Sequence, residues 1–194
     1  MASDSENKST ADRKAIHGAL AVARKKDMFI SFVEKGQARK TGKFLTTLAA
    51  PGTVDPVTSN PIANNLWLST PKQRGSSWYA WAIQEMPEKI HGREIVGFAL
   101  NESKLCKINT VKRLIAFDAK YGEGSKVHSI DWKRVGADFS GVMFVPYMYE
   151  ALVAKISPAS RMEVYDKYGW YRNLDADTVI VWDKTAVRRH ARLL

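Results

Sequence analysis

The sequence predicts an α+β domain in which a small mixed or antiparallel sheet is flanked by helices. Apolar residues recur at helical spacing in some segments and form short strand-like runs in others. The two kinds of segment alternate irregularly, unlike the regular strand–helix–strand units of a parallel sheet. The chain has 194 residues and is 45% hydrophobic, which suffices for one sizeable core.

The first part of the chain is expected to surround the core rather than form it. Its clearest element is a basic amphipathic helix whose apolar positions share one face, namely Ile16, Ala19, Leu20 and Ala23. The expected order is a polar tail (1–12), the basic helix (13–26), an apolar run of either helix or strand (28–33), a basic loop (36–43) and a long Pro-rich loop (50–65). Residues 13–65 are therefore predicted to form a basic helix plus a Pro-rich arm.

Residues 66–184 carry the expected core domain. The predicted strands are 66–70, 94–100, 141–147 and 178–183, and the predicted helices are 76–86, 109–121, 131–138 and 148–156. The expected N-caps of the first three helices are Ser76 or Ser77, Asn109 and Asp131. Residues 185–194 are expected to form a basic tail.

A net charge of +10 indicates a polyanionic or acidic partner, because 30 Lys and Arg face 20 Asp and Glu. Acidic protein subunits of a large assembly fit this charge, as does nucleic acid, and the alternative is a merely solvated basic surface. The candidate contact residues are Arg13, Lys14, Arg24, Lys25, Lys26, Arg39, Lys40, Lys43, Arg188, Arg189 and Arg192.

Several protein classes are disfavoured by composition. The single cysteine, Cys106, rules out an internal disulfide; it is expected to be a small buried hydrophobe in or beside a strand, and the alternative is a reactive thiol. No apolar run reaches the roughly 18–20 residues of a transmembrane helix. The polar, acid-containing N-terminus does not resemble a secretory signal, so the expected location is inside a cell or a virion.

The motifs that carry common chemistries are incomplete. GQARKTGK lacks the spacing of a phosphate-binding P-loop, because five residues separate Gly36 from Gly42 and Phe44 replaces the hydroxyl residue. The four histidines are scattered, so no metal is expected. The six tryptophans are expected mainly in the core, and the alternative is an aromatic and basic groove that stacks bases.

Three stretches together resemble a poorly characterised protein family of phages and large DNA viruses. They are NLWLSTPKQRGSSWYAWAIQE (65–85), IDWKRVGADFSGVMFVPY (130–147) and WYRNLDADTVIVWD (170–183). The resemblance covers about the last two-thirds of the chain. The layout also resembles, remotely, the ADP-ribosyltransferase fold in a degenerate form. That resemblance implies a strand with Ser69 and Thr70 that braces a nicotinamide pocket, and makes Glu163 the nearest candidate for the catalytic carboxylate.

The sequence departs from the transferase pattern, since no Glu-x-Glu or Gln-x-Glu pair precedes the last strand. We therefore lean towards a chain that is not an enzyme and has no cofactor. The first hypothesis is a structural or interaction protein of a viral particle, of the minor-capsid or virion-associated kind, found in the virion or the host cytoplasm. The alternatives are an ADP-ribosyltransferase-like enzyme with NAD as its cofactor, and a sequence-tolerant nucleic-acid-binding protein.

Overall fold

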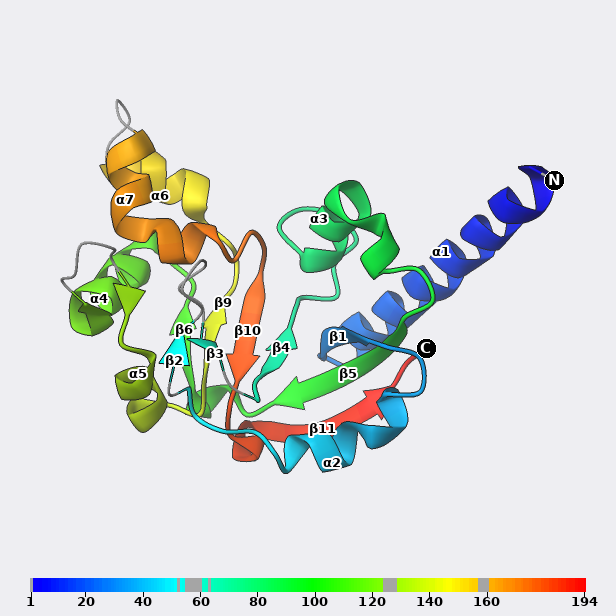
Figure 1. The fold of residues 1–194 in the computed structure, drawn as a ribbon, viewed down its shortest axis with the longest axis horizontal. Helices are drawn as coiled ribbons and strands as arrows, with labels where there is room; N and C mark the ends of the chain where they lie inside the picture. Colours follow the sequence, from blue (N-terminus) through cyan, green and yellow to red (C-terminus); the bar gives the residue numbers. More distant parts are fainter. Residues whose placement is uncertain (1, 52, 55–60, 63, 124–128, 157–160) are drawn as a thin grey trace.

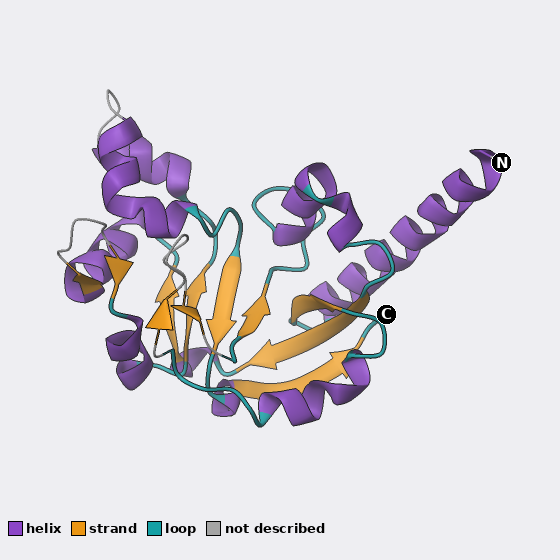
Figure 2. Cartoon of the chain, in the orientation of Figure 1, coloured by secondary structure: helices purple, strands orange, loops and turns teal. Residues whose placement is uncertain are grey.

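Two β-sheets lie face to face between two layers of helices (Figures 1 and 2). The structure is a computed structural model that describes residues 2–51, 53–54, 61–62, 64–123, 129–156 and 161–194, with the backbone alone for 2–11, 53, 54, 61, 62 and 88. The mixed α and β architecture with small mixed and antiparallel sheets confirms the predicted fold class.

The first sheet has the order β1–β5–β11 and is antiparallel throughout. Its strands are β1 (Phe29–Val33), β5 (Glu94–Leu100) and β11 (Val187–Arg192). Every residue of β5 is buried, which explains its nearly continuous apolar sequence. Helices α1 (Ala2–Lys25) and α3 (Trp78–Glu85) cover its outer face, and the predicted apolar stripe of α1 is buried there.

The second sheet has the order β4–β10–β9–β6, in which only the β9–β6 pair is parallel. Its strands are β4 (Leu66–Leu68), β6 (Leu105–Ile108), β9 (Gly141–Phe144) and β10 (Thr178–Val181). Four helices cover its outer face, namely α4 (Val111–Tyr121), α5 (Trp132–Asp138), α6 (Tyr149–Ile156) and α7 (Arg161–Arg172). Tightly packed rings of Phe117, Trp132, Phe144 and Trp170 dominate this core.

The two sheets share a third core between them. Leu66 and Leu68 of β4 contact this core from one side, and Val96 and Phe98 of β5 from the other. Helix α2 (Thr41–Leu45) adds the buried Leu45. The remaining elements are β2 (Thr53–Val54), β3 (Pro61–Ile62), β7 (Gly122–Glu123), β8 (Ser129–Ile130), and the 3-10 turns η1 (Ala38–Lys40), η2 (Pro87–Lys89), η3 (Glu102–Lys104) and η4 (Lys184–Ala186).

Both expected tails belong to regular structure. Residues 187–192 form strand β11, because their backbone pairs with β5 although their side chains are mostly basic. Residues 2–12, expected as a polar tail, continue helix α1 towards the N-terminus. Residue 12 therefore lies within α1, and residue 184 is the first residue of η4.

One open expectation is resolved and others need correction. The run 28–33, expected as either helix or strand, contains strand β1, and the expected basic loop 36–43 contains η1 and most of α2. Helix α4 is capped by Thr110, whose hydroxyl accepts the Arg113 N–H, rather than by the preceding Asn109. Helix α7 was not anticipated. The expected loop 50–65 lies partly outside the described residues, and its described part contains the paired strands β2 and β3.

Two predicted caps are confirmed, as is the predicted position of Cys106 in a strand. The Asp131 carboxylate accepts the N–H of Arg134 at the start of α5, and the Ser77 hydroxyl accepts the N–H of Ala80 at the start of α3. Cys106 lies half-buried in β6, where burial raises the pKa of its thiol to about 11. None of the helices in the described ranges is long and apolar enough to cross a lipid bilayer.

Candidate binding cleft between two sheet edges

The two sheets meet at a single hydrogen-bonded residue pair. Ile30 of β1 and Ser69, just beyond β4, exchange both backbone N–H···O bonds at 2.9 Å. Beyond this pair β1 and β4 follow different sheets, and within the described residues no other backbone hydrogen bond joins them. The strands therefore diverge beyond the Ile30–Ser69 pair, which closes one end of a cleft between them.

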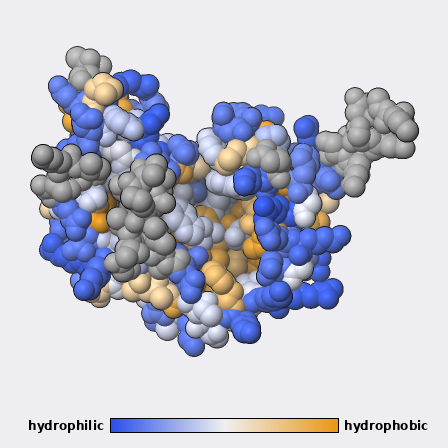
Figure 3. Space-filling model, in the orientation of Figure 1, coloured by the Kyte–Doolittle hydropathy of each residue, from blue (hydrophilic) through white to orange (hydrophobic). Residues whose placement is uncertain are grey.

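The cleft contains two adjoining pockets. The first, here called the Trp78 pocket, has a volume of about 260 Å³ and is lined by Phe32, Ser69 and Trp78 among others. The second, here called the Phe44 pocket, has a volume of about 390 Å³ and is lined by Lys40 and Phe44 among others. Ser31 and Trp67 line both pockets and form their border. Figure 3 shows a hollow with hydrophobic residues at its floor between two more hydrophilic parts of the surface.

Aromatic side chains are unusually accessible in this cleft. Trp67 is 39% exposed and Phe44 is 38% exposed. Strand alternation explains Trp67, because Leu66 and Leu68 on either side of it point into the core between the sheets. Of the six tryptophans, Trp132, Trp170 and Trp182 are buried as expected, whereas Trp67 offers a large apolar surface to a ligand.

A buried carboxylate fixes the rim of the Trp78 pocket. Asp177 has no exposed surface and accepts hydrogen bonds from the Thr70 hydroxyl at 2.9 Å, from the Ser76 hydroxyl and from the Tyr147 N–H at 2.8 Å. The Lys72 ammonium lies 3.5 Å away. Asp177 thus ties the loop between β4 and α3 to the start of β10.

The structure places Ser69 at the cleft and Thr70 buried next to it, and gives both hydroxyls structural partners. Ser69 Oγ accepts the N–H of Trp78 at 2.8 Å, at the start of α3, while its side chain lines the Trp78 pocket. Thr70 is buried and its hydroxyl donates to Asp177. The two predicted residues are therefore brought together with a carboxylate, but that carboxylate is Asp177 rather than Glu163.

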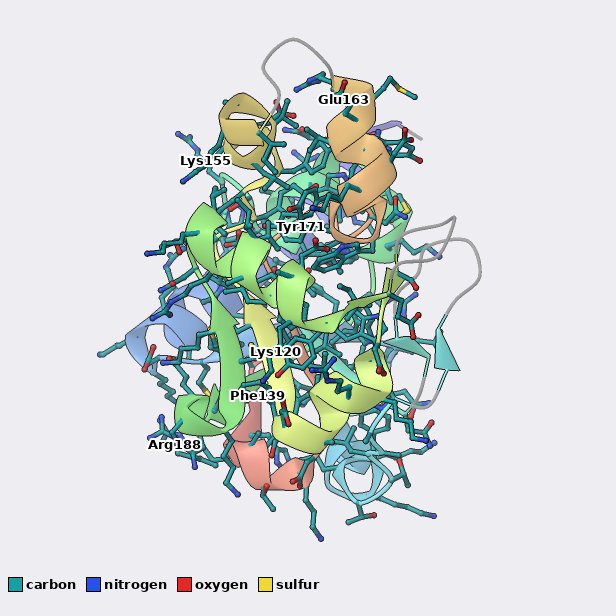
Figure 4. The ribbon with its side chains drawn as sticks, turned by 90° about the vertical axis from the view of Figure 1, so that its left-hand side faces the viewer. Lys120, Phe139, Lys155, Glu163, Tyr171 and Arg188 are labelled. Atoms are coloured by element: carbon teal, nitrogen blue, oxygen red, sulfur yellow. The ribbon has the colours of Figure 1, made fainter. Side chains whose placement is uncertain are left out.

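Glu163 lies elsewhere in the molecule. It is exposed in the first turn of α7, a helix that contributes no residue to either pocket of the cleft. Figure 4 shows it at the far end of the molecule from Arg188. The geometry therefore does not assemble Ser69, Thr70 and Glu163 into one site.

The predicted basic residues fall into neighbouring groups at one side of the fold. The Arg189 guanidinium donates to the Lys26 carbonyl at 3.3 Å, which joins the end of α1 to β11. Arg24 donates to the Pro71 carbonyl at 3.3 Å, next to the loop that Asp177 holds. Among the described residues, only Arg192 of the predicted contact set has an ion pair, with Glu94 at 2.8 Å.

Glu94 connects β5 to the basic turn that precedes α2. Its carboxylate accepts the N–H groups of Ala38 at 3.1 Å and Gly36 at 2.9 Å. The Ala38 hydrogen bond is the largest cause that lowers the pKa of Glu94, and the bond from Gly36 and the charges of Arg192 and Arg39 lower it further against the opposing effect of burial. Glu94 thereby fixes the wall that carries Arg39, Lys40 and Lys43.

A wider cavity of about 630 Å³ lies away from this cleft, with Leu45, Asp138 and Asp183 among its lining residues. Both carboxylates are already engaged. Asp138 accepts hydrogen bonds from Lys120 at 2.8 Å and Tyr121 at 2.5 Å, and Asp183 accepts from Ser140 and Thr185. These partners lower the pKa of both carboxyl groups. The cavity therefore contains carboxylates that already have hydrogen-bond partners, and these are less suited to catalysis.

Comparisons with models of protein families, with curated proteins and with solved structures find no match to this chain. Sequence reasoning singled out Ser69, Thr70 and the tryptophans of the cleft. It missed Asp177 as an anchor, because an acid before a strand resembles an ordinary turn residue. It also missed the exposed Phe44. Two lysines, Lys40 and Lys43, precede this residue and two threonines follow it closely, and such polar neighbours are a signal of surface exposure.

Proposed function

We propose that this chain is an interaction protein that binds an acidic partner in the cleft between β1 and β4. One observation carries the proposal: the Phe44 pocket combines two exposed aromatic rings, Trp67 and Phe44, with the cation Lys40. Aromatic surface supplies binding energy with little loss of conformational entropy, and a cation selects for negative charge.

The charges around the cleft support an acidic partner. The two carboxylates of its lining are both paired, Glu34 with Arg93 at 3.6 Å and Asp177 with Lys72 at 3.5 Å. Lys40 has no ion pair with any residue that the structure describes, and Arg39 and Lys43 flank it in sequence. The mouth of the Phe44 pocket therefore carries excess positive charge.

The polar groups of the cleft favour binding over catalysis. The hydroxyl oxygen of Ser69 accepts the Trp78 N–H, and the Thr70 hydroxyl donates to Asp177. Asp177 itself has three hydrogen-bond donors and a lysine around it. A carboxylate so fully engaged is suited to hold a loop in place, and less suited to move a proton or stabilise a developing charge.

Direct binding measurements test the proposal. Fluorescence anisotropy would compare how tightly three labelled probes bind to the purified chain. The probes are an acidic copolymer of glutamate and tyrosine, oligo(dT) and NAD. We expect the copolymer to bind, and Trp67→Ala and Lys40→Glu each to weaken it by about tenfold or more. Tyr165→Ala is the matched aromatic control, at 40% exposure, and Lys155→Glu the matched charge control.

Each other outcome favours a different function. Binding of oligo(dT) alone, with steep salt dependence, would replace the proposal with a nucleic-acid-binding protein. NAD binding that Ser69→Ala weakens would favour the ADP-ribosyltransferase-like alternative, because Ser69 lines the Trp78 pocket. Equal losses in the cleft variants and the controls would show that the cleft is not the binding surface.

The identity of the partner as a subunit of a viral particle stays a prediction from the sequence. So does the location in a virion or in the host cytoplasm. Immunoblotting of purified particles for this chain is the measurement that decides between the two locations.

A further inference from the structure

We infer that the acidic partner enters the cleft as an extended peptide and pairs, as an added β-strand, with the facing edges of β1 and β4. This inference rests on the proposed function and specifies the form of its partner. It follows from the direction of backbone groups, from the charges of the sheet edges and from the position of the two pockets.

Among the described residues, the backbone groups of β1 and β4 that face the cleft beyond the Ile30–Ser69 pair have no hydrogen-bond partner. Alternate residues of an antiparallel strand direct their N–H and C=O groups to the same side. Ile30 uses that side to bond Ser69, so Phe32, two residues further along β1, points its N–H and C=O the same way. By the same rule the backbone N–H and C=O of Trp67 point away from β10 and towards the cleft. Beyond the Ile30–Ser69 pair these groups face each other across the cleft, and no hydrogen bond within the described residues closes it.

The edges of β1 and β4 differ in charge from the edge formed by β11. Strand β11, at the opposite edge of the first sheet, has the sequence VRRHAR, and charged edge residues discourage pairing with another chain. Strands β1 and β4 read FISFV and LWL and carry no charge. The uncharged edges, both facing the cleft, are the ones that can accept a further strand.

The two pockets lie where the side chains of such a strand would point. Ile30, Phe32 and Trp78 line the Trp78 pocket, whereas Val33, Phe98 and Leu66 line the Phe44 pocket. Phe32 packs towards α1 and α3, while Phe98 and Leu66 pack into the core between the sheets, so the pockets open on opposite faces of the first sheet. Successive residues of a strand alternate between its faces, so alternate peptide side chains fill the two pockets.

The occupant is thus an extended segment with apolar residues at alternating positions and an acidic residue near Lys40. A peptide backbone offers partners for the outward-facing N–H and C=O groups of Phe32 and Trp67. Nucleic acid does not offer donors and acceptors in this pattern. The test uses a phage-displayed library of short linear peptides, selected on the full chain. Selected sequences are then synthesised and their affinities measured with the wild type and with Trp67→Ala.

Backbone methylation of the peptide gives the decisive readout without altering the protein. Methylating the N–H groups of alternate residues that face a strand edge is expected to weaken binding by about tenfold or more, because each methyl removes a hydrogen bond and adds bulk. Because successive peptide residues face β1 and β4 in turn, methylation of either alternate set is expected to weaken binding, whereas methylation of peptide residues beyond the ends of the two strands is expected to change affinity by less than about threefold. Bound peptide is also expected to slow hydrogen exchange of the Phe32 and Trp67 amides, but not of β11 amides.

The outcomes separate this inference from the function beneath it. Peptides that need Trp67 yet tolerate methylation at every position, with unchanged exchange at Phe32 and Trp67, would overturn strand addition and leave the binding cleft standing. If the selection yields no peptide whose binding is weakened by Trp67→Ala, the inference is overturned as well. Failure of the acidic copolymer to bind would overturn the proposed function itself. Pairing of two copies, seen as a doubled mass in analytical ultracentrifugation, would identify a second copy of this chain as the occupant instead.

Discussion

The Thr70 hydroxyl donates a hydrogen bond of 2.9 Å to the Asp177 carboxylate, although 107 residues separate the two in sequence. The same carboxylate accepts from the Ser76 hydroxyl and from the Tyr147 N–H. Three distant segments of the chain are therefore held at one buried charge, beside the Trp78 pocket of the cleft.

Replacing Asp177 by Ala is expected to destabilise the fold by about 3 kcal/mol, because three donors lose a buried acceptor. Urea unfolding followed by tryptophan fluorescence measures the loss. Asp166→Ala, at an exposed position of α7, is the control and is expected to stay within about 0.5 kcal/mol of the wild type. A loss below about 1 kcal/mol for Asp177→Ala would contradict the anchoring role.

Glu94 is expected to make stability depend on pH. The Ala38 and Gly36 N–H groups and Arg192 lower the pKa of Glu94 in the folded state, so its ionised form is favoured by folding. This stabilisation is fully present above the ordinary pKa of glutamate, about 4.3, and is lost as the pH falls through the lowered folded value. Glu94→Gln should therefore be less stable than the wild type at neutral pH, with a smaller difference in acid.

Urea unfolding of wild type and Glu94→Gln between about pH 3 and pH 7 checks this behaviour. Glu102→Gln removes an exposed carboxylate that is 2.6 Å from Lys107, and surface pairs of this kind contribute little. A Glu94→Gln difference that stays constant across the range would show that the loss is not due to the ionised carboxylate.

Gly141 is expected to tolerate no side chain. An added Cβ would lie 2.5 Å from the Ile180 carbonyl oxygen in the neighbouring strand, and backbone in a paired sheet cannot move away. Gly141→Ala should cost about 2 kcal/mol or more. Gly18→Ala, in open space on helix α1, should instead stabilise by about 0.5–1 kcal/mol. Thermal unfolding of the two variants in parallel compares them, and equal effects would contradict the packing argument.

The arginines of β11 are expected to keep the chain monomeric. Arg188 and Arg189 are exposed on an edge strand, where charge discourages edge-to-edge pairing. The double variant Arg188→Thr/Arg189→Thr should aggregate at concentrations at which the wild type stays clear, as measured by light scattering. Lys133→Thr/Lys155→Thr removes the same charge from helices α5 and α6. Equal scattering by both variants would attribute the effect to net charge alone.

The sequence by itself determined those features that depend on neighbouring residues. The stripe of Ile16, Ala19, Leu20 and Ala23 identified the buried face of α1, since helical spacing places these residues side by side. Asp131 was found as a cap, and the cap of α3 was narrowed to Ser76 or Ser77, because a cap and its N–H partner lie three residues apart. The α+β class follows from such local patterns added along the chain.

Only the tertiary structure decided what lies at the cleft. Strand β11 was hidden because an exposed edge strand needs only its backbone to pair, so its basic side chains show no buried alternation. Asp177, Thr70 and Ser76 became one cluster because folding brought distant segments together. The cleft itself exists because β1 and β4 share a single pair, Ile30 and Ser69, and then follow different sheets. The two sheets pack against different helices, and no local sequence pattern encodes the point at which β1 and β4 part.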